Sequence, residues 1–313
     1  MTLPATTRRP RWRAILGGLV LVVALVFAAI ALRHQWPGVR EAVGTMAWPA
    51  LLGAGAFAAL GIVCSAEQQW QLIRSWTSSS FRLQLFRLYF VSQLGKYLPG
   101  PLWAYAAQME LARSRGIDRR TSVFSILLGA AISVLAAGAL TGLVISTPAF
   151  SAVPEGLRWS LIGIAIAVVG VMVARPGAVD RLARWGMKKT KGEEPQTAPS
   201  PQRIRAAIVW TFASWLAFGV HLWILLEASG AGGVGAVPLA IGGFAAAWVV
   251  GFLVFFVPAG IGVREGVMVG VLVATGLEAG TALAIALVSR FLIVAAEVAL
   301  ALPSIIERRR QRA

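Results

Sequence analysis

The sequence predicts an all-α polytopic membrane protein, with about six spanning helices and two Pro/Gly-broken hairpins in an inverted-repeat-like arrangement. Three observations lead to this prediction. Hydrophobic residues make up 58% of the 313 residues and charged residues only 13%, whereas a soluble domain carries about 25% charged residues. Several apolar runs approach or exceed the ~20 residues that a helix needs to cross a bilayer. Two further segments, 81–112 and 238–276, are interrupted by Pro and Gly.

Six apolar runs are predicted to span the membrane: residues 14–32, 48–66, 121–145, 157–174, 206–228 and 281–302. The first run follows four arginines and resembles a secretory signal peptide. Its apolar part is longer than the roughly 7–15 residues of a signal peptide's apolar region. We therefore expect residues 14–32 to form an uncleaved anchor helix.

Basic residues gather at particular segment ends. The expected order is a basic tail 1–13, a first membrane half 14–174 with the segment 81–112, a basic linker 175–205, a second membrane half 206–302 with the segment 238–276, and a basic tail 303–313. Short cytoplasmic loops are enriched in Lys and Arg, so both termini and the linker are predicted to be cytoplasmic in a bacterial inner (plasma) membrane. The linker has the composition of a solvated loop. The net charge of +16 then reflects topology and attraction to an anionic lipid surface, and nucleic acid is not expected as a partner.

Each interrupted segment turns at a Pro/Gly cluster, Leu98-Pro99-Gly100-Pro101 in the first and Pro258-Ala259-Gly260-Ile261-Gly262 in the second. Such breaks leave backbone groups unpaired, and these groups must be buried in protein or line a wet cavity. The first hairpin is predicted to enter from the cytoplasmic side and the second from outside, as in inverted-repeat transporters. Each hairpin is either re-entrant or two full spans, which would give eight helices. Prolines that only kink ordinary helices are the alternative.

Ionisable side chains at membrane depth are costly and normally face a cavity or an opposite charge. Arg290 lies near the middle of the last run, and Arg264 and Glu265 directly follow the second break. We expect Arg290 to pair with Glu265 or with Glu297, which lies two helical turns further on. Glu297 is therefore a candidate counter-ion.

Lys96 and Tyr97 directly precede the first break. A lysine near a helix end either contacts a substrate or reaches the lipid headgroups along its own aliphatic chain, and the sequence leaves both open. His221 is expected to be a packed or hydrogen-bonded residue of its helix.

The sequence offers little for catalysis. The single cysteine, Cys64, permits no internal disulfide, and the two histidines, His34 and His221, are far apart. No nucleotide-binding loop, HExxH or GxSxG motif is present. No catalytic residue, metal site or cofactor is therefore predicted, and the chain is not expected to be an enzyme.

The two breaks resemble a known family. Gly95-Lys-Tyr-Leu-Pro99-Gly100 and Pro258-Ala-Gly260-Ile-Gly262-Val-Arg-Glu265, followed by Arg290, are similar to motifs of the flippase-like transmembrane family named after the membrane domain of lysylphosphatidylglycerol synthase. The resemblance extends over most of the chain and implies a role in moving or handling aminoacylated phospholipids, glycolipids or polyprenyl-linked glycans. The positions carried over by motif are Pro99, Gly100, Pro258, Gly262, Glu265 and Arg290. Aminoacylation is not carried over, because the sequence contains no aminoacyl-transferase domain, and Trp103 departs from members with a small residue there.

The expected function is transport or flipping of an anionic, phosphate-bearing lipid or lipid-linked amphiphile. Its headgroup would pass along a polar groove between the two hairpins, where helix N-termini favour phosphate. The expected substrate-binding residues are Lys96, Tyr97, Pro99, Gly100, Pro258, Gly260, Gly262, Arg264, Glu265 and Arg290. The alternatives are a non-transporting membrane partner of a lipid-modifying enzyme or glycosyltransferase, and an intramembrane enzyme that acts on lipid.

Overall fold

The computed structural model describes residues 44, 46–74, 82–97, 103–113, 117, 119–145, 147, 150–151, 154–189, 200–254 and 258–310. Within these residues every regular element is a helix and no strand is present. The all-α prediction is therefore confirmed. The predicted anchor helix 14–32 lies outside the described residues.

The helices are α2 Trp48–Ile73, α3 Arg82–Gln93, α4 Trp103–Arg113, α5 Arg119–Ile145, α6 Glu155–Ala174, α7 Pro176–Lys189, α8 Pro201–Ala228, α9 Val237–Leu253, α10 Val263–Ala274 and α11 Ala279–Arg310, with short 3-10 turns η1 Leu94–Tyr97, η3 Val234–Ala236 and η4 Pro258–Gly260. Among the described segments, six are long and apolar enough to cross a membrane: those of α2, α5, α6, α8, η3–α9 and α11. Five of them coincide with predicted spans. The sixth is the first limb of the predicted hairpin 238–276. With six helices of spanning length among the described residues, the chain is a multi-pass membrane protein.

Local signals in the sequence fix where several of these helices begin. Ser200 caps α8, because its hydroxyl accepts the Arg203 N–H at 3.3 Å, and Pro201 occupies the first helical position. Glu278 caps α11 by accepting the N–H groups of Gly280 and Thr281 at 2.9 and 2.8 Å. These caps satisfy backbone donors that a helix start leaves without intrahelical partners.

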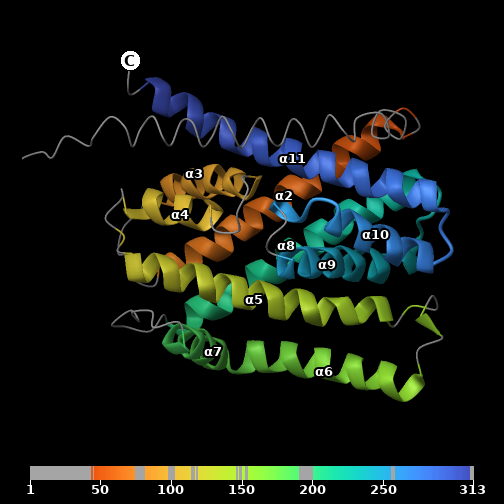
Figure 1. Cartoon of the computed structure of the whole chain (residues 1–313), viewed down its shortest axis with the longest axis horizontal. Helices are drawn as coiled ribbons and strands as arrows, with labels where there is room; N and C mark the ends of the chain where they lie inside the picture. Colours follow the sequence, from red (N-terminus) through yellow and green to blue (C-terminus); the bar gives the residue numbers. More distant parts are fainter. Residues whose placement is uncertain are drawn as a thin grey trace, which may run out of the picture.

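The two halves of the described chain share one pattern, a long helix followed by a short hairpin and a second long helix. The first half consists of α2, the α3–α4 hairpin and α5, and the second consists of α8, the α9–α10 hairpin and α11. The α3–α4 hairpin lies toward one end of the long axis and the α9–α10 hairpin toward the other (Figure 1). Their turning points, η1 and η4, contact each other. The predicted inverted arrangement is therefore present.

Helix lengths indicate how deep each hairpin reaches. α3 and α10 have 12 residues and α4 has 11, so each is about 18 Å long or less, whereas the hydrocarbon core of a bilayer is ~30 Å thick. Within the described residues, both helices of the first hairpin are therefore shorter than the hydrocarbon core. The second hairpin combines one limb of spanning length, α9, with a short one.

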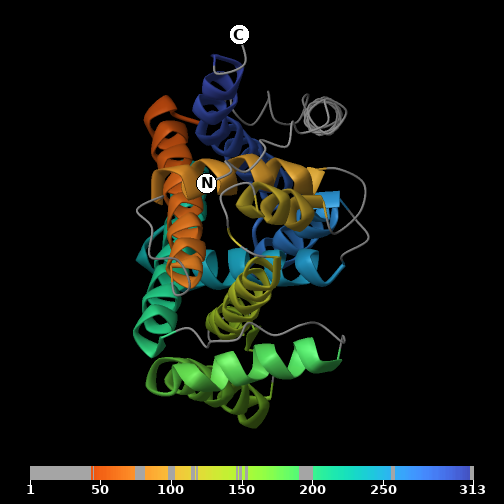
Figure 2. The same cartoon turned by 90° about the vertical axis from the view of Figure 1, so that its left-hand side faces the viewer.

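α2 and α8 form the central packing contact through small residues. A Cβ added at Gly61 would lie 2.9 Å from the Phe218 ring, so any larger residue would force this ring to move. At the same level the Ser214 hydroxyl donates to the Gly61 carbonyl at 2.8 Å, and it lies 2.8 Å from the Ser65 hydroxyl. Close backbone approach and interhelical hydrogen bonds are how membrane helices associate. In Figure 2 these two helices form one side of the molecule, and α6 and α7 lie at its base.

The prediction that residues 175–205 form a loop is wrong for residues 176–189, which form α7. α7 is seen end-on in Figure 1 and lengthwise in Figure 2, so it runs across the direction of α5 and α6. Val179 and Asp180 are buried, Asp180 accepts a hydrogen bond from Arg184 at 3.1 Å, and the Arg184 guanidinium lies 4.9 Å from the Phe124 ring on α5. The segment is amphipathic, and its apolar face packs on α5 although its overall composition is that of a loop.

Candidate functional site

A cavity of about 680 Å³ lies where the two hairpins meet. Its wall is built by α2, α3, α4, α5, α8, α9, α10 and α11 together with both turning points, η1 and η4. The volume falls in the range of roughly 300–1,000 Å³ that is typical of small-molecule sites. The location between the breaks agrees with the requirement that broken backbone at membrane depth be buried in protein or line a wet cavity.

α2 supplies amides to this cavity, because it continues almost two turns beyond the predicted end of its span. Gln68 and Gln69 lie on this extension and line the cavity. The Gln68 amide donates to the Gly129 carbonyl at 3.0 Å and to the Ser133 hydroxyl at 3.2 Å. The Gln69 side chain is only 8% exposed, and its Nε2 has no hydrogen-bond partner among the described residues.

Next to these glutamines and outside the cavity, Glu67 is part of a hydrogen-bond network that joins α2, α3 and α8. The Glu67 carboxylate is buried and accepts hydrogen bonds from Arg82 on α3 at 2.7 Å and from Gln71 at 2.9 Å. Gln71 in turn accepts a hydrogen bond from Arg203 on α8 at 2.9 Å. Arg82 and Arg203 therefore both hold the end of α2, Arg82 directly through Glu67 and Arg203 through Gln71.

Glu297 of α11 holds the first break. Lys96 Nζ donates to one oxygen of its carboxylate, and the Tyr97 hydroxyl donates to the other at 2.8 Å. Glu297 and Tyr97 are both buried. The predicted counter-ion thus has a cationic partner, but that partner is Lys96 and not Arg290. The alternative that Lys96 extends to the lipid headgroups is not realised.

Arg290 holds the second break. Its Nε lies 3.5 Å from Glu265 Oε1, its Nη2 donates to the Ala259 carbonyl at 3.2 Å, and its Cζ lies 5.6 Å from the Tyr97 ring centre. The other oxygen of Glu265 accepts the Gly262 N–H at 2.6 Å. Arg290 and Glu265 do not belong to the described lining of the central cavity. Of the two pairings predicted for Arg290, the one with Glu265 is present.

Arg264 lines the cavity and forms no ion pair with an acidic side chain within the described part of the chain. Its Nε is buried and has no hydrogen-bond partner among the described residues, and its Cζ lies 5.7 Å from the Trp248 ring centre. Around the two breaks three cations, Lys96, Arg264 and Arg290, face two carboxylates, Glu265 and Glu297. The cluster therefore carries one excess positive charge. This charge lies next to the cavity, because Arg264 lines the cavity wall.

Two glycines make room for the Arg264 side chain. A Cβ added at Gly251 of α9 would overlap the Arg264 aliphatic chain, and one added at Gly260 would lie 3.0 Å from Arg264 Nε. Gly260 also has a φ of +65°, a conformation that glycine adopts with little strain. Ala259 adopts a φ of +50° and its carbonyl accepts the Arg290 hydrogen bond described above.

Two aromatic rings connect Arg264 to a neighbouring part of the cavity wall. The centroids of Trp248 and Trp215 are 5.1 Å apart with nearly perpendicular rings, and both residues line the cavity. Trp215 is buried, and its Nε1 has no hydrogen-bond partner among the described residues. The cationic Arg264 and the neutral N–H donor of Trp215 thus lie on adjoining parts of one cavity wall.

His221 lies outside this arrangement. Its ring nitrogens are each 2.8 Å from an oxygen, the Ala54 carbonyl and the Ser289 hydroxyl, so it is a fully bonded core residue as predicted. No group of three or more His, Cys, Asp or Glu residues that could hold a metal ion occurs in the described ranges.

The structure brings the sequence-predicted residues of both breaks to one place, but only some of them face the cavity. Its described lining contains Lys96, Gly260 and Arg264. Tyr97, Glu265 and Arg290 lie behind them, Gly262 starts α10, Pro258 is described only in its backbone, and Pro99 and Gly100 lie outside the described residues. Four further residues of the cavity wall were not predicted from the sequence: Gln69, Trp215, Trp248 and Gly251. A signal for Gln69 was present, since Gln68 and Gln69 continue an apolar run with no breaker between.

The comparisons with known proteins concern nearly the whole chain. A family model described as the lysylphosphatidylglycerol synthase TM region matches residues 15–301. No curated protein matches the sequence. The matched region contains both hairpins, α11 up to Ala301, and every residue of the cavity described above.

Proposed function

We propose that this chain, which belongs to the lysylphosphatidylglycerol synthase TM region family, binds the headgroup of an anionic, phosphate-bearing lipid or lipid-linked amphiphile in the central cavity and moves it across the bilayer. Family membership gives the chain a membrane lipid-related role. The observation that carries the finer proposal is Arg264, a cation at membrane depth whose Nε has no described protein partner and which faces a cavity of about 680 Å³.

A lipid crosses a bilayer slowly because its polar headgroup must leave water for hydrocarbon. A cavity with amides, hydroxyls and an unneutralised guanidinium replaces part of that lost hydration, while the acyl or prenyl tails stay in the lipid. Arginine suits this role, because its planar guanidinium matches the geometry of phosphate. Hairpins that enter from opposite ends and meet at the cavity resemble transporters in which one half rocks against the other around a fixed site.

α11 is the element that such rocking would have to move. Through Glu297 it holds the first break and through Arg290 it holds the second. A shift of α11 relative to either hairpin would therefore change the cavity walls at η1 and η4 together. This coupling supports an alternating opening of the cavity to the two sides.

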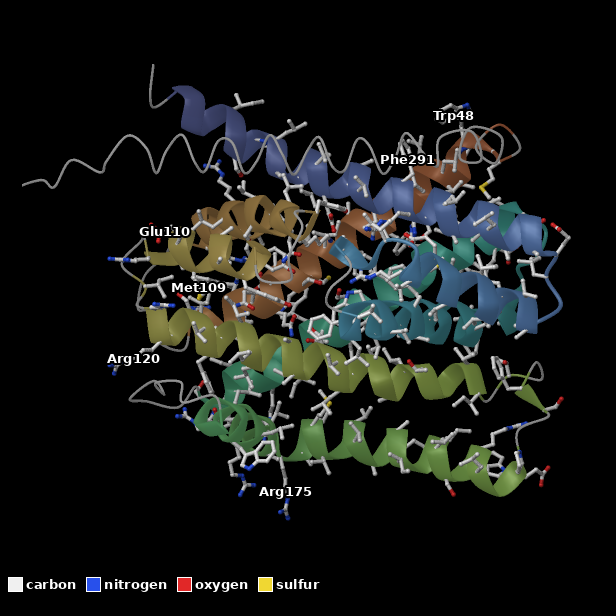
Figure 3. The ribbon with its side chains drawn as sticks, viewed as in Figure 1. Trp48, Met109, Glu110, Arg120, Arg175 and Phe291 are labelled. Carbon is white, nitrogen blue, oxygen red and sulfur yellow. The ribbon has the colours of Figure 1, made fainter. Side chains whose placement is uncertain are left out.

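We further propose a cell-membrane location with the α3–α4 end in the cytoplasm. Glu110 and Arg120 lie at that end, Trp48 lies toward the opposite end, and Arg175 lies near the junction of α6 and α7 (Figure 3). Arginines concentrated near one end of the spans support a cytoplasmic assignment of that end.

A second candidate function is a non-transporting partner of a lipid-modifying enzyme or glycosyltransferase. α6 favours it, because this spanning-length helix buries little of its surface against the rest of the described chain and exposes Leu157, Ile164 and Ile166. The same surface also suits direct contact with lipid tails. Translocation by the purified chain alone separates the two candidates.

The test is a headgroup-accessibility assay in liposomes that contain the full chain and a trace of fluorescent phosphatidylglycerol. A membrane-impermeant quencher reports the fraction of labelled headgroups in the outer leaflet over time. We expect faster exchange between leaflets than in protein-free liposomes, and a rate near the protein-free value for Arg264→Gln. Arg175→Gln is the matched control, because it removes an exposed arginine away from the cavity, and it should leave the rate unchanged. A folded wild-type chain that exchanges lipid no faster than empty liposomes would refute translocation and favour the partner function.

A further inference from the structure

Among the residues that the structure describes, three that line the cavity have a buried hydrogen-bond donor without a partner. They are Gln69 Nε2, Trp215 Nε1 and Arg264 Nε, from α2, α8 and α10, and all three residues line the same cavity. Gln69 is 8% exposed and Trp215 only 4%. Buried donors are nearly always paired in native proteins. A ligand in this cavity could supply acceptors to these three donors, which have none among the described residues.

The carboxylate on the described cavity wall is, in contrast, already used by the protein. Glu297 is the one carboxylate in the described lining, and its two oxygens accept hydrogen bonds from Lys96 and Tyr97. An ammonium group presents only donors, and it would find no free carboxylate on this part of the wall.

The net charge of the site also disfavours a headgroup that ends in an ammonium group. The excess positive charge of the cluster reaches the cavity at Arg264, and a second cation placed there would be repelled. Repulsion between like charges is stronger in a poorly hydrated interior than in water. An anionic phosphodiester is attracted by the same charge and brings several acceptor oxygens.

We propose that the cavity is a headgroup subsite that selects anionic, acceptor-rich phosphodiester headgroups and rejects headgroups that end in an ammonium group. This inference rests on the proposed function, since it assigns the ligand to a lipid. Gln69 and Trp215 are its specificity-determining residues, because they donate to neutral oxygens of the headgroup while Arg264 binds the phosphate. The headgroup in the family's name carries the ammonium groups of lysine. The cavity of this chain therefore fits the unmodified phosphatidylglycerol headgroup better than its lysyl ester.

The test is a binding measurement on the purified full chain in detergent with three short-chain probes: phosphatidylglycerol, lysylphosphatidylglycerol and phosphatidylcholine. Phosphatidylglycerol should bind about tenfold or more tightly than either probe with an ammonium group. Gln69→Met and Trp215→Phe each remove one donor and should weaken phosphatidylglycerol binding roughly fivefold, the effect of one ordinary hydrogen bond. Trp48→Phe, at a position 70% exposed, is the matched control and should bind like the wild type.

A further variant keeps the test decisive if those substitutions unfold the chain. Gln69→Glu is nearly isosteric and replaces the unpaired donor by a carboxylate, so it should shift the preference toward lysylphosphatidylglycerol. Equal binding of all three probes by the wild type, or no shift in a folded Gln69→Glu variant, would overturn the selectivity while leaving translocation intact. Absence of binding by every lipid would instead contradict the proposed function. Glycerol phosphate that binds as tightly as the lipid would overturn the assignment to a lipid headgroup.

Discussion

Lys96 and Glu297, which are 201 residues apart in the sequence, form an ion pair that joins the first broken hairpin to the last helix. On the same helix Arg290 lies 3.5 Å from Glu265 of the second hairpin. Arg290 and Glu297 are separated by two helical turns and thus share one face of α11. Both breaks are therefore held by one helix, and the cavity lies where they meet.

We expect the Lys96–Glu297 pair to be more sensitive to the loss of one partner than to the loss of both. Lys96→Met would leave the Glu297 carboxylate, whose side chain is 5% exposed, with only the Tyr97 hydroxyl. Breaking a buried pair in this way costs about 3–5 kcal/mol, whereas replacing both partners is often nearly neutral. Thermal unfolding in detergent should therefore show a large loss for Lys96→Met and a recovery for Lys96→Met with Glu297→Gln. Additive losses would mean that the two side chains do not interact.

The Arg290–Glu265 pair is expected to act by positioning the second break. The double variant Arg290→Met with Glu265→Gln should recover part of the stability that either single change loses. Recovery should be incomplete, because Arg290 also donates to the Ala259 carbonyl. Lipid exchange by the stable double variant should exceed that of Arg264→Gln, since neither Arg290 nor Glu265 belongs to the described cavity lining. A stable double variant without any exchange would instead support the sequence prediction that Arg290 contacts the substrate.

Gly251→Ala tests whether the position of Arg264 matters. The added methyl group would overlap the Arg264 side chain and push it from its slot, so lipid exchange should fall. Gly266→Ala on α10 is the matched control, because a Cβ there meets nothing within 4 Å. Both substitutions replace a helical glycine and gain up to about 1 kcal/mol of helix propensity. Equal exchange rates for the two variants would argue against a role for Arg264.

The membrane orientation can be tested with two exposed glycines that have open space around them. Gly177 lies in the first turn of α7 and Gly156 in the first turn of α6, and a Cβ at either meets nothing within 4 Å. In a Cys64→Ala background, we expect an impermeant thiol reagent to label Gly156→Cys in intact cells and Gly177→Cys only after permeabilisation. The reverse pattern would invert the proposed orientation.

Much of the fold could be predicted from sequence, because long apolar runs leave a helix as the only economical way to cross a bilayer. The polar end of α2 is a part of the fold that apolar runs do not predict. Glu67, Gln68, Gln69 and Gln71 are polar and lie beyond the predicted end of the span at residue 66, yet they are buried. Partners from α3, α5 and α8 bury them, and the order of residues along the chain does not encode such distant contacts.

The candidate site was predicted to a similar degree. Charges at membrane depth were recognised because burying them is costly, and the Arg290–Glu265 pair was one of two expected. The Lys96–Glu297 pair was not expected, since nothing in the sequence specifies how the first break faces α11. Gly251 carried no signal, because a glycine inside an apolar helix looks the same whether or not a side chain fills the space beside it.

The proposed function depends on a lipid headgroup entering the cavity between the hairpins. This entry can be detected by photocrosslinking with phosphatidylglycerol that carries a photoreactive group in its headgroup, with adducts located by mass spectrometry in the reconstituted chain. We expect adducts on peptides that contain Gln69, Trp215 or Trp248, and a strong decrease of these adducts in Arg264→Gln. Adducts confined to the exposed face of α6, around Leu157 and Ile166, and equal in both proteins, would contradict it.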